Sequence, residues 1–141
     1  MAFSHDGSRM VTGDDTTIRV WDAAGKLLIA FPSEHSGRLF GVAFSQDDAR
    51  LVSTGYDGTA RIWEAPSGKP LAILRGHVGG VNEVGFSPDG SRIVTASDDG
   101  TARIWSCWAW APVEFQLATA SQLEAGLFPV CDPPPGTAPA R

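Results

Sequence analysis

The chain has 141 residues, of which 43% are hydrophobic and 19% charged, and its formal net charge is −5. This composition is that of an ordinary globular domain and excludes collagen-like and wholly disordered chains. The acidic balance argues against binding of nucleic acid, because such surfaces gather Lys and Arg around the phosphates.

The cysteine content and the N-terminal residues predict in which cellular compartment the protein lies. Cys107 and Cys131 are the only cysteines, without the close spacing of a zinc site or the density of a disulfide scaffold. We therefore expect no metal, no cofactor and a reducing environment. FSHDGSR follows almost directly on Met1, with no signal peptide, and no apolar run approaches the roughly 20 residues that span a bilayer. These features predict a cytoplasmic protein without a membrane partner.

The first unit reads FSHDGSRMVTGDDTTIRVWD from Phe3 to Asp22. Its apolar residues form short runs bounded by Asp and Gly, which is typical of β-strands joined by tight turns. We expect strands over residues 9–12, 17–21 and 26–30. Because only Met1 and Ala2 precede Phe3, we expect this unit to lack its opening strand.

The next two units are near copies of each other. They read FSQDDARLVSTGYDGTARIW from Phe44 to Trp63 and FSPDGSRIVTASDDGTARIW from Phe86 to Trp105, an offset of 42 residues. A fixed period of this length is the signature of a repeat architecture. The predicted strands of these two units are 39–44, 50–53, 59–63 and 71–74, then 81–86, 92–95 and 101–105. We therefore predict an all-β chain of four-stranded antiparallel units over residues 1–31, 32–74 and 75–105, the last unit lacking its fourth strand.

Residues 106–141 depart from the repeat and form a Pro-rich tail. We predict disorder from residue 132, because this composition buries too little apolar surface to offset the ordering entropy. A short helix within 113–126 is weakly indicated. Trp108 and Trp110 either cover the edge of the third unit or lie exposed as an adhesive surface.

These units resemble the WD-repeat β-propeller family. The family's Gly-His, FSPDG and SxDGTxxIWD elements correspond to Gly76-His77, Phe86–Gly90 and Ser97–Trp105. The resemblance implies incomplete propeller blades, one full and two partial, and a hydrogen-bond network of His, Ser or Thr, Asp and Trp within each blade. By position the network residues are His35, Ser53, Asp57 and Trp63, then His77, Thr95, Asp99 and Trp105, and in the first unit Thr12, Asp15 and Trp21.

Ser, His and Asp also make up hydrolase triads, so His35, Ser53 and Asp57 suggest a catalytic alternative. Against it, the trio recurs with the 42-residue period, carries Thr in place of Ser in the third unit, and lacks a GxSxG motif. A packing device repeats with the fold, whereas a catalytic site is normally unique. We therefore predict a structural network and no enzyme.

The resemblance places partner binding on the rim where a blade's opening strand meets the turn before its third strand. The corresponding residues are Arg38, Phe40, Tyr56, Asn82 and Asp98. Gly80 and Asp14 occupy equivalent positions, where we favour a solvent-facing turn residue. Phe40 and Tyr56 do not belong to the Phe and Trp positions that form the core of the repeat. Arg and aromatic residues are enriched in interface hot spots.

Three units fall short of the roughly four to eight blades at which propellers close. We therefore expect the chain to be part of a longer repeat protein, with a truncated product or a piece completed by self-association through open sheet edges as alternatives. The predicted function is a non-catalytic scaffold or sensor module that presents its rim to a protein or peptide. A non-functional remnant and a propeller enzyme are the competing interpretations.

Overall fold

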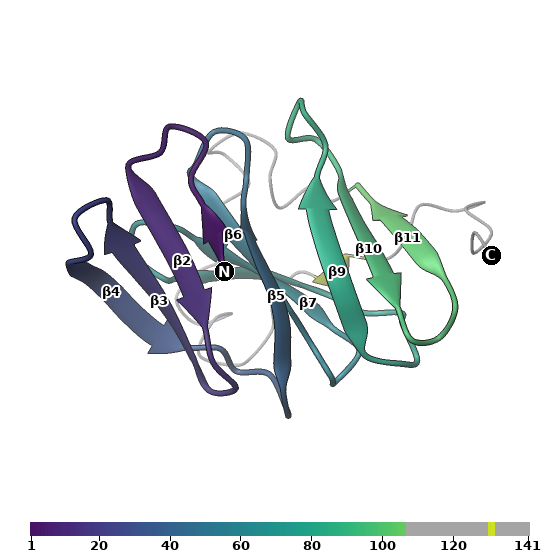
Figure 1. The fold of residues 1–141 in the computed structure, drawn as a ribbon. Helices are drawn as coiled ribbons and strands as arrows, with labels where there is room; N and C mark the ends of the chain where they lie inside the picture. The colour runs from purple at the N-terminus through teal and green to yellow at the C-terminus, as the bar shows by residue number, and fades with distance from the viewer. Residues whose placement is uncertain (107–129, 132–141) are drawn as a thin grey trace.

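The computed structural model describes residues 1–106 and 130–131, and within these ranges every regular element is a β-strand. The strands form three sheets in chain order, here called blades 1, 2 and 3, which stand side by side (Figure 1). The predicted all-β fold, with antiparallel blades that do not close into a barrel, is thus confirmed. The described part of the chain contains no helix long and apolar enough to cross a membrane.

Blade 1 is an antiparallel sheet in the order β1-β2-β3-β4. Its strands are β1 (Ala2–Phe3), β2 (Arg9–Gly13), β3 (Thr17–Asp22) and β4 (Leu27–Pro32). The prediction that this unit lacks its opening strand was wrong. Although β1 has two residues, it pairs with β2 through Ala2 opposite Val11 and Phe3 opposite Met10, because the turn at Gly7 returns the chain at the right register.

Blade 2 contains the four predicted strands and one more. They are β5 (Leu39–Phe44), β6 (Arg50–Gly55), β7 (Ala60–Glu64) and β8 (Pro70–Leu74). The additional strand is β12 (Val130–Cys131), which pairs in parallel with the outer strand β8. Sequence reasoning did not anticipate β12. The helix considered within 113–126, Trp108, Trp110 and the Pro-rich end from 132 lie outside the described residues.

Blade 3 is a three-stranded antiparallel sheet in the order β11-β10-β9. Its strands are β9 (Val81–Phe86), β10 (Ile93–Ser97) and β11 (Ala102–Trp105). Among the described residues no strand pairs with the outer edge of β11, whereas in blade 2 the identical segment of β7 pairs with β8.

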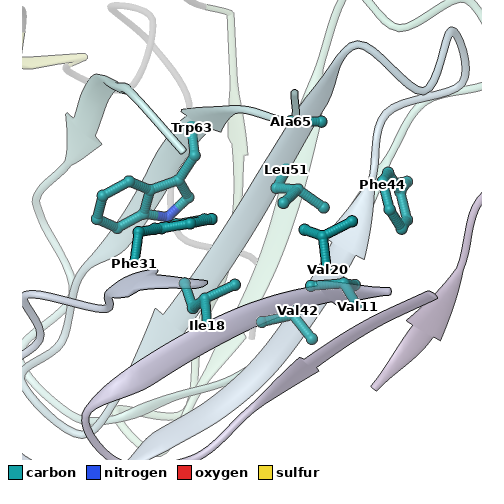
Figure 2. Packing of buried hydrophobic residues seen from close by; sticks show 9 residues of the cluster. All are labelled: Val11, Ile18, Val20, Phe31, Val42, Phe44, Leu51, Trp63 and Ala65. Carbon is teal, nitrogen blue, oxygen red and sulfur yellow. The ribbon is translucent and has the colours of Figure 1, made fainter. Parts of the chain in front are cut away.

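The core between blades 1 and 2 is formed by apolar side chains from facing sheets (Figure 2). Val11, Ile18 and Val20 of blade 1 contact the face of blade 2 that carries Trp63. Phe31 lies against the indole of Trp63 with ring centroids 5.1 Å apart. A second core of the same kind joins the opposite face of blade 2 to blade 3.

A polar link also joins blades 1 and 2, at the turn between β5 and β6. Asp48 has the left-handed backbone conformation, with φ of 56°, that Gly7 and Gly90 adopt in the equivalent turns of the other blades. Its buried carboxylate accepts hydrogen bonds from the backbone N–H groups of His5 and Asp6, at 2.7 and 3.0 Å. The residue that makes the turn strained therefore also ties the two blades together.

Candidate functional site

The structure brings together the four predicted network residues of blade 2. His35 lies between Asp57 and Ser53, with Nδ1 3.1 Å from the carboxylate and Nε2 2.9 Å from the hydroxyl oxygen. The indole N–H of Trp63 donates to the same Ser53 oxygen at 2.9 Å. One hydroxyl therefore joins the loop before β5, which carries His35, to β6 and β7.

Blade 3 repeats this arrangement with Thr in place of Ser. His77 Nδ1 lies 2.8 Å from Asp99, and its Nε2 lies 2.8 Å from the hydroxyl of Thr95. The indole N–H of Trp105 donates to that hydroxyl at 2.8 Å. Because Thr and Ser supply the same oxygen, the two blades have one network with interchangeable hydroxyl residues.

The Asp of each network also holds the turn before the third strand of its blade. Asp57 accepts hydrogen bonds from the N–H and hydroxyl of Thr59, at 3.1 and 2.7 Å, and from the N–H of Ser36 at 2.9 Å. Burial raises the pKa of Asp57, but these hydrogen bonds and His35 outweigh it, so the pKa lies below its ordinary value. For His35, burial acts in the other direction and lowers the pKa, because burial disfavours the charged imidazolium. The pair thus favours a carboxylate beside a neutral imidazole.

This geometry does not suit nucleophilic catalysis. The side chain of Ser53 is fully buried, and its oxygen already contacts both His35 and Trp63. A hydrolase nucleophile must reach a substrate carbonyl and is activated by a base without a competing donor on the same oxygen. The trio is therefore a packing device that fixes the strands of the blade.

Blade 1 keeps only part of the network. The indole N–H of Trp21 donates to the hydroxyl of Thr12 at 2.9 Å. The turn before β3 is held by Asp14, which accepts from the backbone N–H groups of Thr16 and Thr17 at 3.0 and 2.9 Å. Asp15, the residue predicted for this position, does not accept these hydrogen bonds, because the turn is one residue shorter than in blade 2.

Asp14 also pairs with Arg19, which follows on β3. The hydrogen bond from Arg19 and those from Thr16 and Thr17 hold the pKa of Asp14 below its ordinary value. Asp14 is exposed, which agrees with the solvent-facing turn residue predicted at this position, and it is in addition the acceptor that holds the turn. Its role in the turn could not be read from the sequence, because the adjacent Asp15 matched the repeat equally well.

The predicted rim residues of blade 2 form an exposed aromatic pair. Phe40 on β5 and Tyr56 in the turn after β6 lie edge to face, with ring centroids 6.4 Å apart and 37% and 67% of their surface exposed. The backbone carbonyl of Arg38 accepts a hydrogen bond from the N–H of Tyr56 at 2.8 Å, so the loop before β5 and the turn are fixed together. The side chain of Arg38 is exposed.

The rim residues of blade 3 adjoin this pair. The side-chain amide of Asn82 donates to Asp98 at 2.6 Å, and the N–H of Asp98 donates to the carbonyl of Gly80 at 2.9 Å. A Cβ atom at Gly80 would lie 2.9 Å from the ring of Phe40 and 3.3 Å from the carboxylate of Asp98. The prediction that Gly80 faces solvent was wrong, since Gly80 is buried between the two sets and allows them to meet across the junction of blades 2 and 3.

We call the surface formed by Arg38, Phe40, Tyr56, Asn82 and Asp98 the rim patch. It combines an apolar centre with one cationic and one anionic side chain. Within residues 1–106 and 130–131, no cluster of three or more His, Cys, Asp or Glu side chains is arranged to hold a metal ion.

Comparison with known proteins agrees with this architecture. The model of the WD domain, G-beta repeat, matches three stretches of the chain, residues 1–22, 25–64 and 68–106. The second and third stretches each include the outer strand of one blade, β4 or β8, and the three strands of the next. Consecutive sequence repeats are therefore interlocked through shared blades. Among curated proteins, none matches the chain.

Proposed function

The chain belongs to the WD40 repeat family, and we propose that it is a non-catalytic scaffold or sensor module that binds a protein or peptide through the rim patch. WD40 repeats generally mediate contacts between proteins, and their domains are typically non-catalytic. The proposal is specific to the junction of blades 2 and 3, and it assumes that the chain works within a larger repeat architecture.

One observation carries the proposal, namely the exposed pair of Phe40 and Tyr56. Aromatic rings contribute large contact area at low entropic cost, and tyrosine is enriched at the centres of interfaces. At the equivalent positions blade 3 carries Asn82 and Asp98. The aromatic pair is therefore no requirement of the fold, and this supports a role in binding.

The charges of the patch indicate the chemistry of the ligand. Asp98 adjoins the aromatic pair through Gly80 and favours a Lys or Arg side chain on the partner. Arg38, the last residue before β5, is joined to Tyr56 through its backbone carbonyl and favours an acidic group on the partner. We propose that the ligand is an extended peptide with an apolar or aromatic residue between groups of opposite charge.

Selection from a random peptide library displayed on phage tests the proposal with the purified chain. We expect selected peptides to lose at least about tenfold in affinity for the variant Phe40→Ala/Tyr56→Ala, since hot-spot residues contribute about 2 kcal/mol or more. Val78→Ala is the matched control, because Val78 is 93% exposed and lies outside the patch. Peptides that bind the double variant as well as the unmodified chain would contradict the proposal.

A further inference from the structure

Each blade has two rows of apolar residues, one on each side of its sheet. Within a row, the residues lie opposite one another on neighbouring strands. The row that includes a Phe and a Trp, here called the aromatic row, is fixed by strand register. It comprises Phe3, Met10 and Trp21 in blade 1, Phe44, Leu51 and Trp63 in blade 2, and Phe86, Ile93 and Trp105 in blade 3.

The aliphatic row lies on the other side of the sheet, one residue out of step with the aromatic row, because successive side chains of a strand point to opposite faces. It comprises Ala2, Val11, Val20 and Ile29 in blade 1, Ala43, Val52, Ile62 and Ala72 in blade 2, and Gly85, Val94 and Ile104 in blade 3.

Both junctions in the structure pair an aliphatic row with an aromatic row. Between blades 1 and 2, the buried Val11 and Val20 belong to one cluster with Phe44, Leu51 and Trp63 (Figure 2). Between blades 2 and 3, the aliphatic row of blade 2 belongs to one cluster with Ile93 and Trp105. The same pairing therefore recurs although the two junctions differ in sequence.

One row of each kind has no facing blade among the described residues. Val94 and Ile104 of blade 3 are 46% and 45% exposed, whereas their counterparts Val52 and Ile62 in blade 2 are fully buried. On blade 1, Phe3 is 67% exposed, whereas its counterpart Phe44 is buried. Met10 and Trp21 of the same row are half-buried, whereas their counterparts in blade 2 are buried. The exposed rows are thus the two complementary halves of an interface that the chain already forms twice.

We propose that the aliphatic row of blade 3 packs on the aromatic row of blade 1 of a second copy of this chain. The repeat makes these halves complementary in residue size and in register. The Asp48 link of the first junction is not needed, because the second junction has Gly90 at that position and is formed all the same. Pairing at both ends of each chain joins two copies of three blades, which gives a ring within the roughly four to eight blades of closed propellers.

Head-to-tail pairing of this kind differs from pairing through sheet edges or between like faces, and the difference can be tested. The variant Val94→Lys/Ile104→Glu removes the apolar surface of blade 3 and leaves a cross-strand pair of opposite charge, since these residues are opposite each other on β10 and β11. The variant Phe3→Glu/Met10→Lys does the same to blade 1, where these two residues are opposite each other.

Gel filtration with light scattering on the full chain gives the decisive masses. We expect the unmodified chain to have about twice the monomer mass of 14.9 kDa, each variant alone to be a monomer, and an equimolar mixture of the two variants to form dimers. The mixture recovers pairing because one variant keeps the row that the other has lost. Val78→Lys, on a fully accessible side chain away from both rows, is the control and should leave the dimer mass unchanged.

Three outcomes would overturn the proposal. These are a monomeric unmodified chain, a variant that alone keeps the mass of the unmodified chain, and a mixture that stays monomeric while both variants retain the circular dichroism of the unmodified chain. Retained mass in both variants would indicate association through sheet edges. If a double variant does not fold, Val94→Lys and Phe3→Glu alone replace the double variants, because Val94 is 46% and Phe3 67% exposed.

Discussion

Replacing Asp48 with Gly should weaken the junction between blades 1 and 2. The carboxylate of Asp48 accepts hydrogen bonds from the N–H groups of His5 and Asp6, at 2.7 and 3.0 Å, and each bond crosses from one blade to the other. The substitution removes both bonds, and with them the contact between the carboxylate and the half-exposed ring of His5, whose Nδ1 lies 3.2 Å away. It also places at this position the residue that the equivalent turns of blades 1 and 3 carry, so that the left-handed backbone no longer costs energy.

The two effects have opposite signs and can be compared. A net gain of about 1.5 kcal/mol for each bond to a charged acceptor is the lower end of the usual range, and it applies here because His5 and Asp6 are exposed and water can replace the carboxylate. Relief of the left-handed conformation returns about 1 kcal/mol. We therefore expect Asp48→Gly to lower the free energy of unfolding by about 2 kcal/mol.

The variant Asp48→Asn separates the two contributions. Asn tolerates the left-handed conformation and keeps one acceptor oxygen, so we expect a loss of about 1 kcal/mol. Urea unfolding followed by tryptophan fluorescence at one fixed protein concentration measures both variants, and hydrogen exchange at the amides of His5 and Asp6 reports the junction itself. A Gly variant at least as stable as the unmodified chain, with unchanged exchange at these amides, would show that Asp48 does not hold the two blades together.

The effect should also depend on pH. Burial raises the pKa of Asp48, but the hydrogen bonds from the backbone of His5 and Asp6 outweigh it and bring the pKa below its ordinary value. A carboxyl with a lowered folded-state pKa contributes stability above its unfolded pKa of about 3.9, and this is lost as the pH falls through the folded value. The difference between the unmodified chain and Asp48→Asn should therefore shrink below about pH 4.

Three further changes test other parts of the structure. Ser53→Ala leaves the imidazole and the indole without their shared buried oxygen and should lower the free energy of unfolding in urea by about 2–4 kcal/mol. Ser53→Thr introduces the residue type of the other two blades and should lower it by less than about 1 kcal/mol. Equal losses in the two variants would contradict the network. Gly68→Ala should destabilise by about 1–3 kcal/mol more than Gly25→Ala, because its Cβ would lie 2.3 Å from Phe31, whereas Gly25 has the same left-handed conformation in open space. Burial lowers the pKa of His35, so the free energy of unfolding should fall as the pH drops below about 6.5, and a variant His35→Gln with an equally steep decline would contradict this.

The repeat made the strands and much of the network predictable, because both follow from local patterns that occur more than once. The spacing of His35, Ser53 and Trp63 relative to the predicted strands is sufficient to bring them together once the sheet forms. Asp15 was misplaced because blade 1 has a shorter turn, and two adjacent Asp residues fit the repeat equally well. The choice between them depends on the path of the backbone.

Contacts between segments far apart in sequence were less predictable. The pairing of β12 with β8 joins residues more than fifty positions apart. Because β12 contains two residues, it is too short to show the alternating pattern from which a strand is predicted. In the sequence, Asp48 occupies the position at which the FSPDG motif of the third unit has Gly. Its role appears only when the turn of blade 1 is brought beside it.

The repeat also explains why the fold was easier to predict than the function. A residue that recurs at the 42-residue period serves the blade, so its identity carries no information about a partner. Information about partners lies in the departures from the repeat, such as Phe40 and Tyr56 where blade 3 has Asn82 and Asp98. The aliphatic and aromatic rows are the exception. They recur in every blade, and the exposed rows differ from the buried ones only in position. A row that holds two blades together at both junctions of the structure has no facing blade on the outer faces of blades 1 and 3 among the described residues, and the proposed pairing of two copies rests on this.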